Sequence, residues 1–281
     1  MSAKIVQDNY GKSRVRLMKV ERTGDHHDLQ NLTLNIALEG NFDAIHTVGD
    51  NSLCLPTDTM KNTVYALAAQ TKKIETPEAF GQRLAAHFLA NNPQISCVTI
   101  EIFEHTWKRM KFDGEEHPHS FVKGSGEKRT AKITATRDAV TVEAGVEDLI
   151  VLKTTQSGFV GFIKDAYTTL PEATDRIFST AIKATWAYGN ATDATDAAFH
   201  AIRQTILKVF SDHDSLSVQH TLYAIGEAIL NDYADVESIA FSLPNIHCLP
   251  IDMTKFGQIN DNRIFVPTDE PHGLIEARLT R

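Results

Sequence analysis

The sequence of 281 residues has little cysteine, and none of its apolar runs reaches the roughly 20 residues needed to cross a bilayer. Its three cysteines, Cys54, Cys97 and Cys248, are far apart and form no CxxC pair. This spacing argues against a disulfide framework or a zinc site and predicts three small, buried apolar side chains. The N-terminal segment lacks the apolar region of a secretory signal, and the C-terminus lacks a Ser-Lys-Leu type of peroxisomal signal. We therefore expect a cytoplasmic protein without a membrane partner.

Basic residues are also in the minority, with 28 Lys and Arg against 36 Asp and Glu, a net charge of -8. Phosphate backbones select clustered basic residues, so we expect no nucleic-acid partner. The chain contains no GxGxxG, GxxxxGK[ST] or HExxH pattern. It therefore lacks the usual signals for a dinucleotide, a nucleoside triphosphate or a catalytic zinc ion, and small molecules are the expected partners.

Two histidine groups could suggest a metal site. His26 and His27 are adjacent, so their side chains would point apart in an extended segment, and we interpret them as a solvated hairpin turn. His117 and His119 have the HxH spacing of one strand face, but Pro118 and the charged residues around it indicate a loop. We predict no metal site.

What the sequence does contain is apolar residues spaced as in a repeated order of strands and helices. Residues 14–20 and 30–38 alternate apolar and polar side chains, which predicts a hairpin, and residues 59–70 and 77–90 have helical spacing. Thr76 and Pro77 supply a cap and a first helical position. Strand spacing returns at residues 95–104 and 132–136, with a polar loop between them. The first half is therefore predicted as ββααββ.

The second half repeats this plan. Strands are expected at residues 139–142, 149–155 and 177–188, helices at 196–211 and 216–232, and final strands at 238–243 and 264–267. No Gly/Ser linker separates the halves. We predict an α+β fold of two tandem units, residues 1–137 and 138–281, with an antiparallel sheet and its helices on one face. Such a sheet leaves open edges, which favours closure into a barrel by association with another subunit.

Several motifs carry a resemblance to one family. The segment 149–176, LIVLKTTQSGFVGFIKDAYTTLPEATDR, closely resembles the signature segment of the urate oxidase family. The similarity also includes Tyr10-Gly-Lys12, residues 56–65 (PTDTMKNTVY), Ser217-Val-Gln219 and residues 242–247 (SLPNIH). Because these motifs agree in order and spacing over essentially the whole chain, coincidence is a poor explanation. The sequence departs from the family pattern beside Phe159, where Gly158 and Val160 stand at positions at which bulkier residues are familiar.

The resemblance implies the tunnelling fold, with two ββααββ units per chain, a barrel closed by two subunits and a homotetramer of two stacked barrels. It implies active sites at subunit interfaces. The implied activity is oxidation of urate by dioxygen and water to 5-hydroxyisourate and hydrogen peroxide in purine catabolism, with no cofactor.

The same resemblance assigns the site residues. Arg176 and Gln219 would bind the polar edge of urate, Phe159 would stack on its ring, and the backbones of Val218 and Asp58 would contact it. Lys12, Thr57 and His247 would relay protons, and Asn245 would hold dioxygen and then water above the ring. Two alternatives remain open at this point. One is another tunnelling-fold enzyme acting on a pterin or guanine nucleotide, and the other is a non-catalytic purine-binding oligomer.

Overall fold

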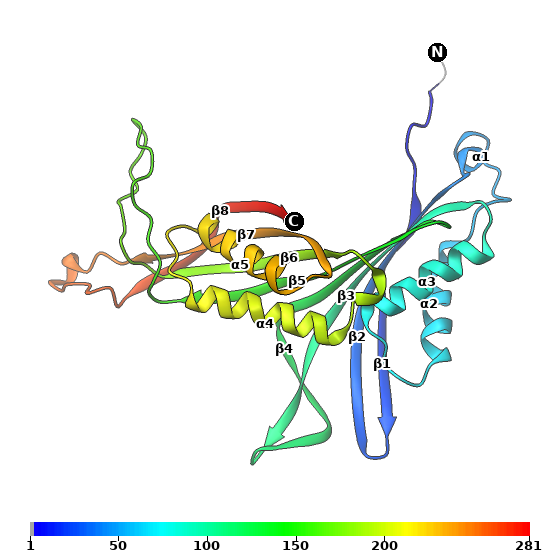
Figure 1. The fold of residues 1–281 in the computed structure, drawn as a ribbon, viewed down its shortest axis with the longest axis horizontal. Helices are drawn as coiled ribbons and strands as arrows, with labels where there is room; N and C mark the ends of the chain where they lie inside the picture. The colour runs from blue at the N-terminus through cyan, green and yellow to red at the C-terminus, as the bar shows by residue number, and fades with distance from the viewer. Residues whose placement is uncertain (1–2) are drawn as a thin grey trace. The chain divides into compact units, whose positions relative to one another are not determined.

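The computed structural model describes residues 3–281, which divide into two compact units. The first unit extends to Gly145 and includes Ala187–Phe199, and the second comprises Val146–Trp186 and His200–Arg281. Figure 1 labels the elements of both units in chain order.

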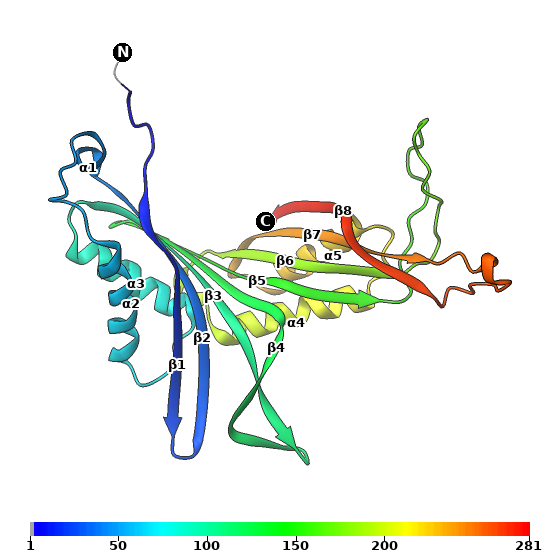
Figure 2. The same ribbon diagram turned by 180° about the vertical axis from the view of Figure 1, so that it is seen from behind.

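The first unit is an antiparallel sheet covered by helices. Its strands are β1 (Tyr10–Thr23), β2 (His26–Gly40), β3 (Ile95–Phe112) and β4 (Glu115–Ala135), and its helices are α1 (Asp43–Thr47), α2 (Thr57–Gln70) and α3 (Pro77–Asn91). Neighbouring strands in the chain are neighbours in the sheet. Helix α2 packs on β1, and α3 packs on β3 and β4, on the same face of the sheet (Figures 1 and 2). The predicted hairpin and both long helices are confirmed, whereas α1 was not predicted.

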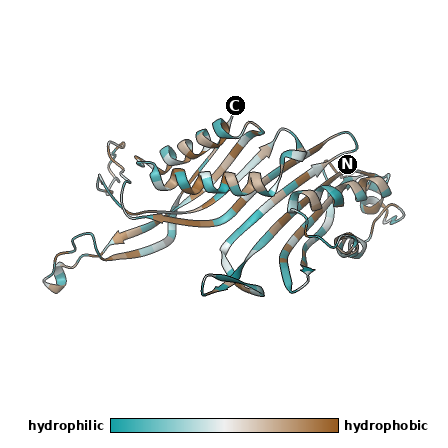
Figure 3. Ribbon diagram, turned by 60° about the horizontal axis from the view of Figure 1, so that its bottom comes forward, coloured by the Kyte–Doolittle hydropathy of each residue, from teal (hydrophilic) through white to brown (hydrophobic). Residues whose placement is uncertain are grey.

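Local sequence explains these elements. Along β2 the buried side chains alternate with more exposed ones, and Leu32, Leu34 and Leu38 are fully buried. Figure 3 shows this alternation of hydropathy along the strands. Helix α3 begins at Pro77, and the Thr76 hydroxyl accepts a hydrogen bond from the Ala79 N–H at 3.1 Å. The cap satisfies one of the free amides at the start of the helix.

The predicted polar loop between residues 104 and 132 was wrong. Strand β3 continues to Phe112, and β4 begins at Glu115 and includes His117, Pro118 and His119. The ladder shifts register between Arg109 and Lys111, so Pro118 lies outside the paired positions and need not donate a ladder hydrogen bond. The sequence pattern could not show this irregularity.

The second unit repeats the plan. It contains most of β5 (Val140–Lys153) and α4 (Asp196–Asp212), together with α5 (Val218–Asp232), β7 (Val236–Pro250) and β8 (Phe265–Thr280); β6 (Phe178–Tyr188) ends at its border. Strand order again follows the chain, and α5 packs on β7 and β8. Two short 3-10 helices were not predicted: Thr254–Phe256 in this unit and Ala191–Asp193 in the part of the chain that belongs to the first unit.

Three strands in this half also differ from expectation, and one of them is β7, which was expected at residues 238–243 and runs from Val236 to Pro250. The two strands expected at residues 139–142 and 149–155 are one strand, β5, which runs from Val140 to Lys153. Within it Asp148 has a positive φ of 60°, a local irregularity outside the usual β region. The last strand is far longer than residues 264–267, since β8 continues through residues that pair with β7 up to Thr280.

The structure also bears on the cysteines and histidines. All three cysteines are free and only partly buried, so the expectation of buried side chains was wrong. The hairpin turn lies at Gly24 and Asp25, and His26 opens β2. Within residues 3–281 there is no cluster of three or more His, Cys, Asp or Glu with the geometry of a metal site. Within the same range no helix is long and apolar enough to span a membrane.

Candidate active site

In the first unit, Lys12 lies at an irregularity of β1. It pairs opposite Ile36, and the register then shifts before Val15. Arg14 has a positive φ of 59°, and its N–H donates to Asn35 Oδ1 at 2.9 Å instead of to the ladder. Such a bulge changes the direction of the neighbouring side chains and is common beside functional sites.

Thr57 and Asp58 form the first turn of α2, directly after Pro56. The Asp58 carboxylate accepts hydrogen bonds from Lys61 and Asn62 at 2.5 and 2.9 Å. The bond from Lys61 is the main cause that lowers the pKa of Asp58, and the charge of Lys12 contributes as well. Lys12 therefore lies within electrostatic range of the start of α2, and the first unit brings Lys12, Thr57 and Asp58 together.

Tyr10 and Gly11 support this group, a role that sequence reasoning missed. The Tyr10 hydroxyl accepts a hydrogen bond from the Leu55 N–H at 2.8 Å and so holds the segment before α2. Burial raises the pKa of Tyr10 to about 12, so the phenol stays protonated. A side chain at Gly11 would place its Cβ 1.7 Å from the Ile36 carbonyl oxygen, so only glycine fits beside Lys12.

In the second unit, Phe159 and Arg176 lie on two paired segments. Phe159 exchanges backbone hydrogen bonds with Ala173 at 2.7 and 3.1 Å, and the Arg176 N–H donates to the Ser157 carbonyl at 2.7 Å. The Arg176 guanidinium carbon lies 5.3 Å from the centre of the Phe159 ring, and Phe162 stacks on that ring at 4.8 Å. The aromatic ring and the cation therefore form one surface.

The charge of Arg176 is not balanced by a neighbouring carboxylate. The side chain is about half-buried, and burial lowers the pKa of Arg176 below its ordinary value. In the part of the chain that the structure describes, no acidic group pairs with it; the adjacent Asp175 carboxylate accepts from Thr155 and from the Ser157 N–H. A half-buried guanidinium without a counter-ion is suited to bind an anion.

The start of helix α5 is hydrogen-bonded to the segment that bears Phe159. Ser217 caps the helix by accepting from the His220 N–H at 3.1 Å. Val218 opens the helix and is buried, whereas Gln219 is exposed. Ser215, just before the cap, accepts a hydrogen bond from the Gly158 N–H at 2.7 Å, which joins the start of α5 to the segment that bears Phe159.

Asn245 and His247 lie on β7 on either side of another register shift, opposite Gly273 and Thr268. Both side chains are partly exposed, and among the described residues neither has a hydrogen-bond partner. The structure thus places Arg176 beside Phe159, links their segment to the start of α5, which carries Val218 and Gln219, and places Asn245 and His247 on a separate strand of the same unit.

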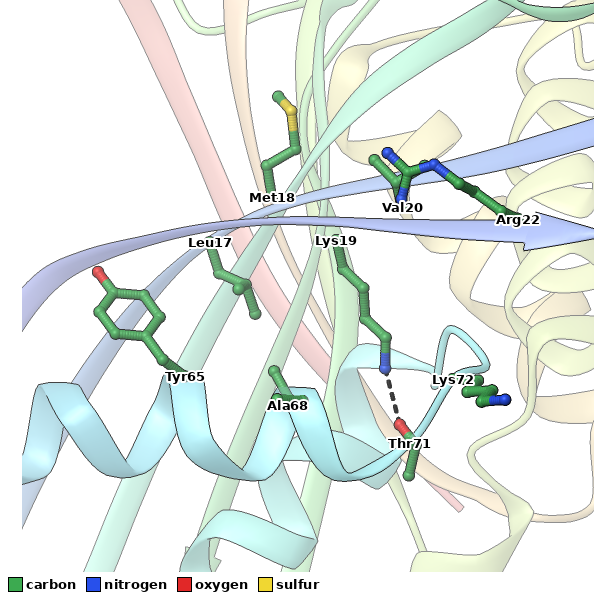
Figure 4. Close-up of a pocket in the computed structure, with 10 residues that line it drawn as sticks. Leu17, Met18, Lys19, Val20, Arg22, Tyr65, Ala68, Thr71 and Lys72 are labelled. Atoms are coloured by element: carbon green, nitrogen blue, oxygen red, sulfur yellow. Dashed lines mark hydrogen bonds between the residues drawn. The ribbon is translucent and has the colours of Figure 1, made fainter.

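A cavity of about 450 Å³ lies elsewhere, between β1 and α2 of the first unit. Figure 4 shows Lys19 pointing across it to Thr71, with a hydrogen bond of 2.7 Å. None of the predicted site residues lines this cavity. The chemistry of the molecule must therefore be sought at the two polar groups described above.

The fold and these groups define a class: an α+β protein of two sheet-and-helix units whose polar side chains suit a flat anionic ligand. The chain matches the family described as Uricase over residues 8–134 and 142–276. The uricase of Arthrobacter globiformis is 39% identical over 275 residues, which cover 98% of this chain and 89% of that protein. The uricase of Oryctolagus cuniculus is 37% identical over 283 residues, 98% of this chain and 94% of that protein.

Solved structures give the same result. The crystal structure of the Arthrobacter globiformis uricase has a TM-score of 0.95 at 38% identity and covers 100% of this chain and 96% of that chain. A hyperthermostable mutant of Bacillus sp. TB-90 urate oxidase has a TM-score of 0.85 at 25% identity and covers 98% of this chain and 100% of that chain. The chain belongs to the uricase family. This finding favours urate oxidation over the pterin or guanine-nucleotide alternative considered from the sequence.

Proposed function

We propose that this chain is a urate oxidase that converts urate, dioxygen and water to 5-hydroxyisourate and hydrogen peroxide without a cofactor. Membership of the uricase family supports the reaction. The observation that carries the proposal within the molecule is the half-buried Arg176 guanidinium beside the Phe159 ring, with no carboxylate partner among the described residues. It offers a positive charge and a flat apolar surface at the same place.

Urate fits this arrangement because it is a planar purine anion. The guanidinium of Arg176 can donate two parallel hydrogen bonds to its polar edge, and the Gln219 amide can both donate and accept. Phe159 can stack on the ring face. The backbone at Val218 and at Asp58 would complete the polar contacts.

The proposed chemistry needs proton transfer and positioning. Loss of a proton makes urate electron-rich enough to reduce dioxygen directly; the two electrons end on hydrogen peroxide, and water supplies the hydroxyl group added to the purine. Lys12 and Thr57, with His247, would relay the protons. Asn245 would hold dioxygen and then the attacking water above the ring.

We further propose a homotetramer with active sites at subunit interfaces, in which residues 1–137 and 138–281 are the two repeats. Strands β1 and β8 end the strand order and each pairs with a single strand, so their outer edges can pair with another subunit and close a barrel. The site residues are divided between the units, with Lys12 and Thr57 in the first and Arg176 and Gln219 in the second. The cytoplasm is the compartment that we predict, and cell fractionation tests it.

Three parallel readings test the activity: urate loss at its near-ultraviolet band, oxygen uptake and peroxide release. The protein should be treated with chelator and freed of flavin first. Equal amounts of urate consumed, oxygen consumed and peroxide formed would support the proposal. Urate bound but not consumed would instead identify a binding protein, and activity restored only by an added metal or flavin would refute the cofactor-free reaction.

A further inference from the structure

Ser215 lies between the two segments that carry Phe159 and Gln219, and it bonds to both. Its N–H donates to the Gln156 carbonyl at 2.9 Å, and its carbonyl accepts from the Gly158 N–H at 2.7 Å. These bonds form a short parallel bridge with the segment around Ser157. Ser215 is fully buried, so water does not compete for them.

The side chain of Ser215 bonds in the other direction, toward α5. Its hydroxyl donates to the Ser217 carbonyl at 3.0 Å and accepts from the Thr221 hydroxyl at 2.7 Å. Thr221 lies on α5 and is also buried. Since the Thr221 proton points to Ser215, the Thr221 oxygen accepts from His213 Nδ1, which lies 3.2 Å away.

These bonds form one directed chain from His213 through Thr221 and Ser215 to the Ser217 carbonyl, and each hydroxyl in it both donates and accepts. We refer to it as the hydroxyl chain. Ser217 is the cap of α5, and the next two residues are Val218 and Gln219. A displacement of Ser215 would therefore move the start of α5 relative to the segment that holds Phe159.

We propose that Ser215 and Thr221 are positioning residues for the urate site, and that the hydroxyl chain sets the distance between the Phe159 ring and the Gln219 amide. This inference rests on the function proposed above. Neither residue has to touch urate. Their effect is on binding, because a ligand held between a ring and an amide needs both at a fixed separation.

The test uses two variants, Ser215→Ala and Thr221→Val, which remove the hydroxyls with little change in volume. Urate affinity is measured by titration without oxygen, and kcat and KM are measured with oxygen. We expect Kd and KM to rise about tenfold in both variants while kcat changes less than about twofold, since only ligand alignment is lost. Thr221→Ser keeps the hydroxyl and should restore the wild-type Kd.

Thr205→Val is the matched control. It removes a hydroxyl that bonds to the Tyr233 hydroxyl at 2.9 Å, at the opposite end of α5. This variant should lower the melting temperature without changing Kd. A purely structural role for the hydroxyl chain predicts the same behaviour for Ser215→Ala and Thr221→Val.

The outcomes separate clearly. A wild-type Kd in Thr221→Val, or an equal rise of Kd in Thr205→Val, would overturn the inference. If Ser215→Ala does not fold, the comparison of Thr221→Val with Thr221→Ser decides. If the wild-type protein binds and oxidises no urate, it is the proposed function that fails, and the positioning role fails with it.

Discussion

At the scale of single residues, the proposed urate binding and the proposed proton relay rest on different side chains, Arg176 for the first and Lys12 with Thr57 for the second. Arg176 has no described carboxylate partner and is half-buried, so an anionic ligand is its natural counter-ion. Lys12 lies at a bulge of β1 and Thr57 opens α2, and the charge of Lys12 acts on the neighbouring Asp58 carboxylate. Substitution should therefore separate the two roles.

Arg176→Ala should weaken urate binding. Hydrogen bonds to a charged group contribute about 1.5–3 kcal/mol, so Kd should rise by about 10- to 150-fold. Anaerobic titration with urate measures this change. Arg176→Lys keeps the positive charge but loses the planar guanidinium with its paired donors. Its Kd for urate should lie between those of the wild type and Arg176→Ala. An unchanged Kd in Arg176→Ala would show that the guanidinium does not bind urate.

Thr57→Ala should instead lower turnover. Loss of a proton relay costs about 100-fold or more in kcat, while Kd should stay within about twofold of the wild type. Steady-state oxygen uptake and anaerobic titration measure the two quantities. Thr63→Ala is the control, because its exposed hydroxyl bonds only to the Thr59 carbonyl of the same helix. Wild-type turnover in Thr57→Ala would remove Thr57 from the relay.

At the scale of elements, a buried ion pair joins helix and sheet in the first unit. Arg129 on β4 bonds to Glu78 on α3 at 2.7 Å and to Asp196 at the start of α4 at 2.5 Å. Glu78 is fully buried. Burial raises the pKa of Glu78 and that of Glu104, while the charge of Arg129 opposes this rise. Arg129 thus lowers the free-energy cost of keeping the buried Glu78 carboxyl group charged.

Arg129→Met should lower the free energy of unfolding by about 3–5 kcal/mol near pH 8, because it leaves the buried Glu78 carboxylate unpaired. In this variant the folded-state pKa of Glu78 rises further above its unfolded value. The protonated Glu78 then stabilises the folded variant at low pH, and this stabilisation is lost as pH rises through the folded-state pKa. The loss of unfolding free energy relative to the wild type should therefore be smaller near pH 5.5 than near pH 8. Urea denaturation at both pH values measures it.

Arg137→Met is the matched control for that prediction. Arg137 bonds to the backbone carbonyls of Leu89, Asn92 and Pro93 and to no carboxylate among the described residues. The loss of unfolding free energy in Arg137→Met should be equal at both pH values. A deficit in Arg129→Met that does not change with pH would mean that the buried carboxyl groups are not its cause.

At the scale of the whole molecule, the proposed interface sites would be complete only in the assembled oligomer. The proposed relay lies in the first unit and the proposed anion site in the second. If sites form between subunits, Lys12→Met and Arg176→Ala chains assembled together should regain activity. Random mixing gives about a quarter of the sites both intact residues.

The measurement is urate turnover of the co-assembled variants against each variant alone. Chains mixed after assembly, without exchange of subunits, serve as the control and should remain inactive. No recovery in co-assembled chains would show that Lys12 and Arg176 act within one chain, and the interface proposal would be wrong.

The sequence by itself determined the element plan and the family. The alternation that includes Leu32, Leu34 and Leu38 indicates a half-buried strand. Thr76 followed by Pro77 indicates the start of a helix. Both signals depend only on residues that are close together in the chain. Motifs from Tyr10-Gly-Lys12 to residues 242–247 identified the family by order and spacing. The roles of the site residues came from that resemblance and stay predictions.

Only the tertiary structure decided the features that depend on distant partners. Pro118 can lie in β4 because its opposite strand shifts register, and β5 runs through Asp148 even though the backbone there has a positive φ. Arg176 could be recognised as unpaired, and Ser215 as the node of a hydroxyl chain, only when every neighbour was in place. Local sequence sets periodicity and caps, whereas burial and hydrogen-bond partners are fixed by which segments meet in the folded chain.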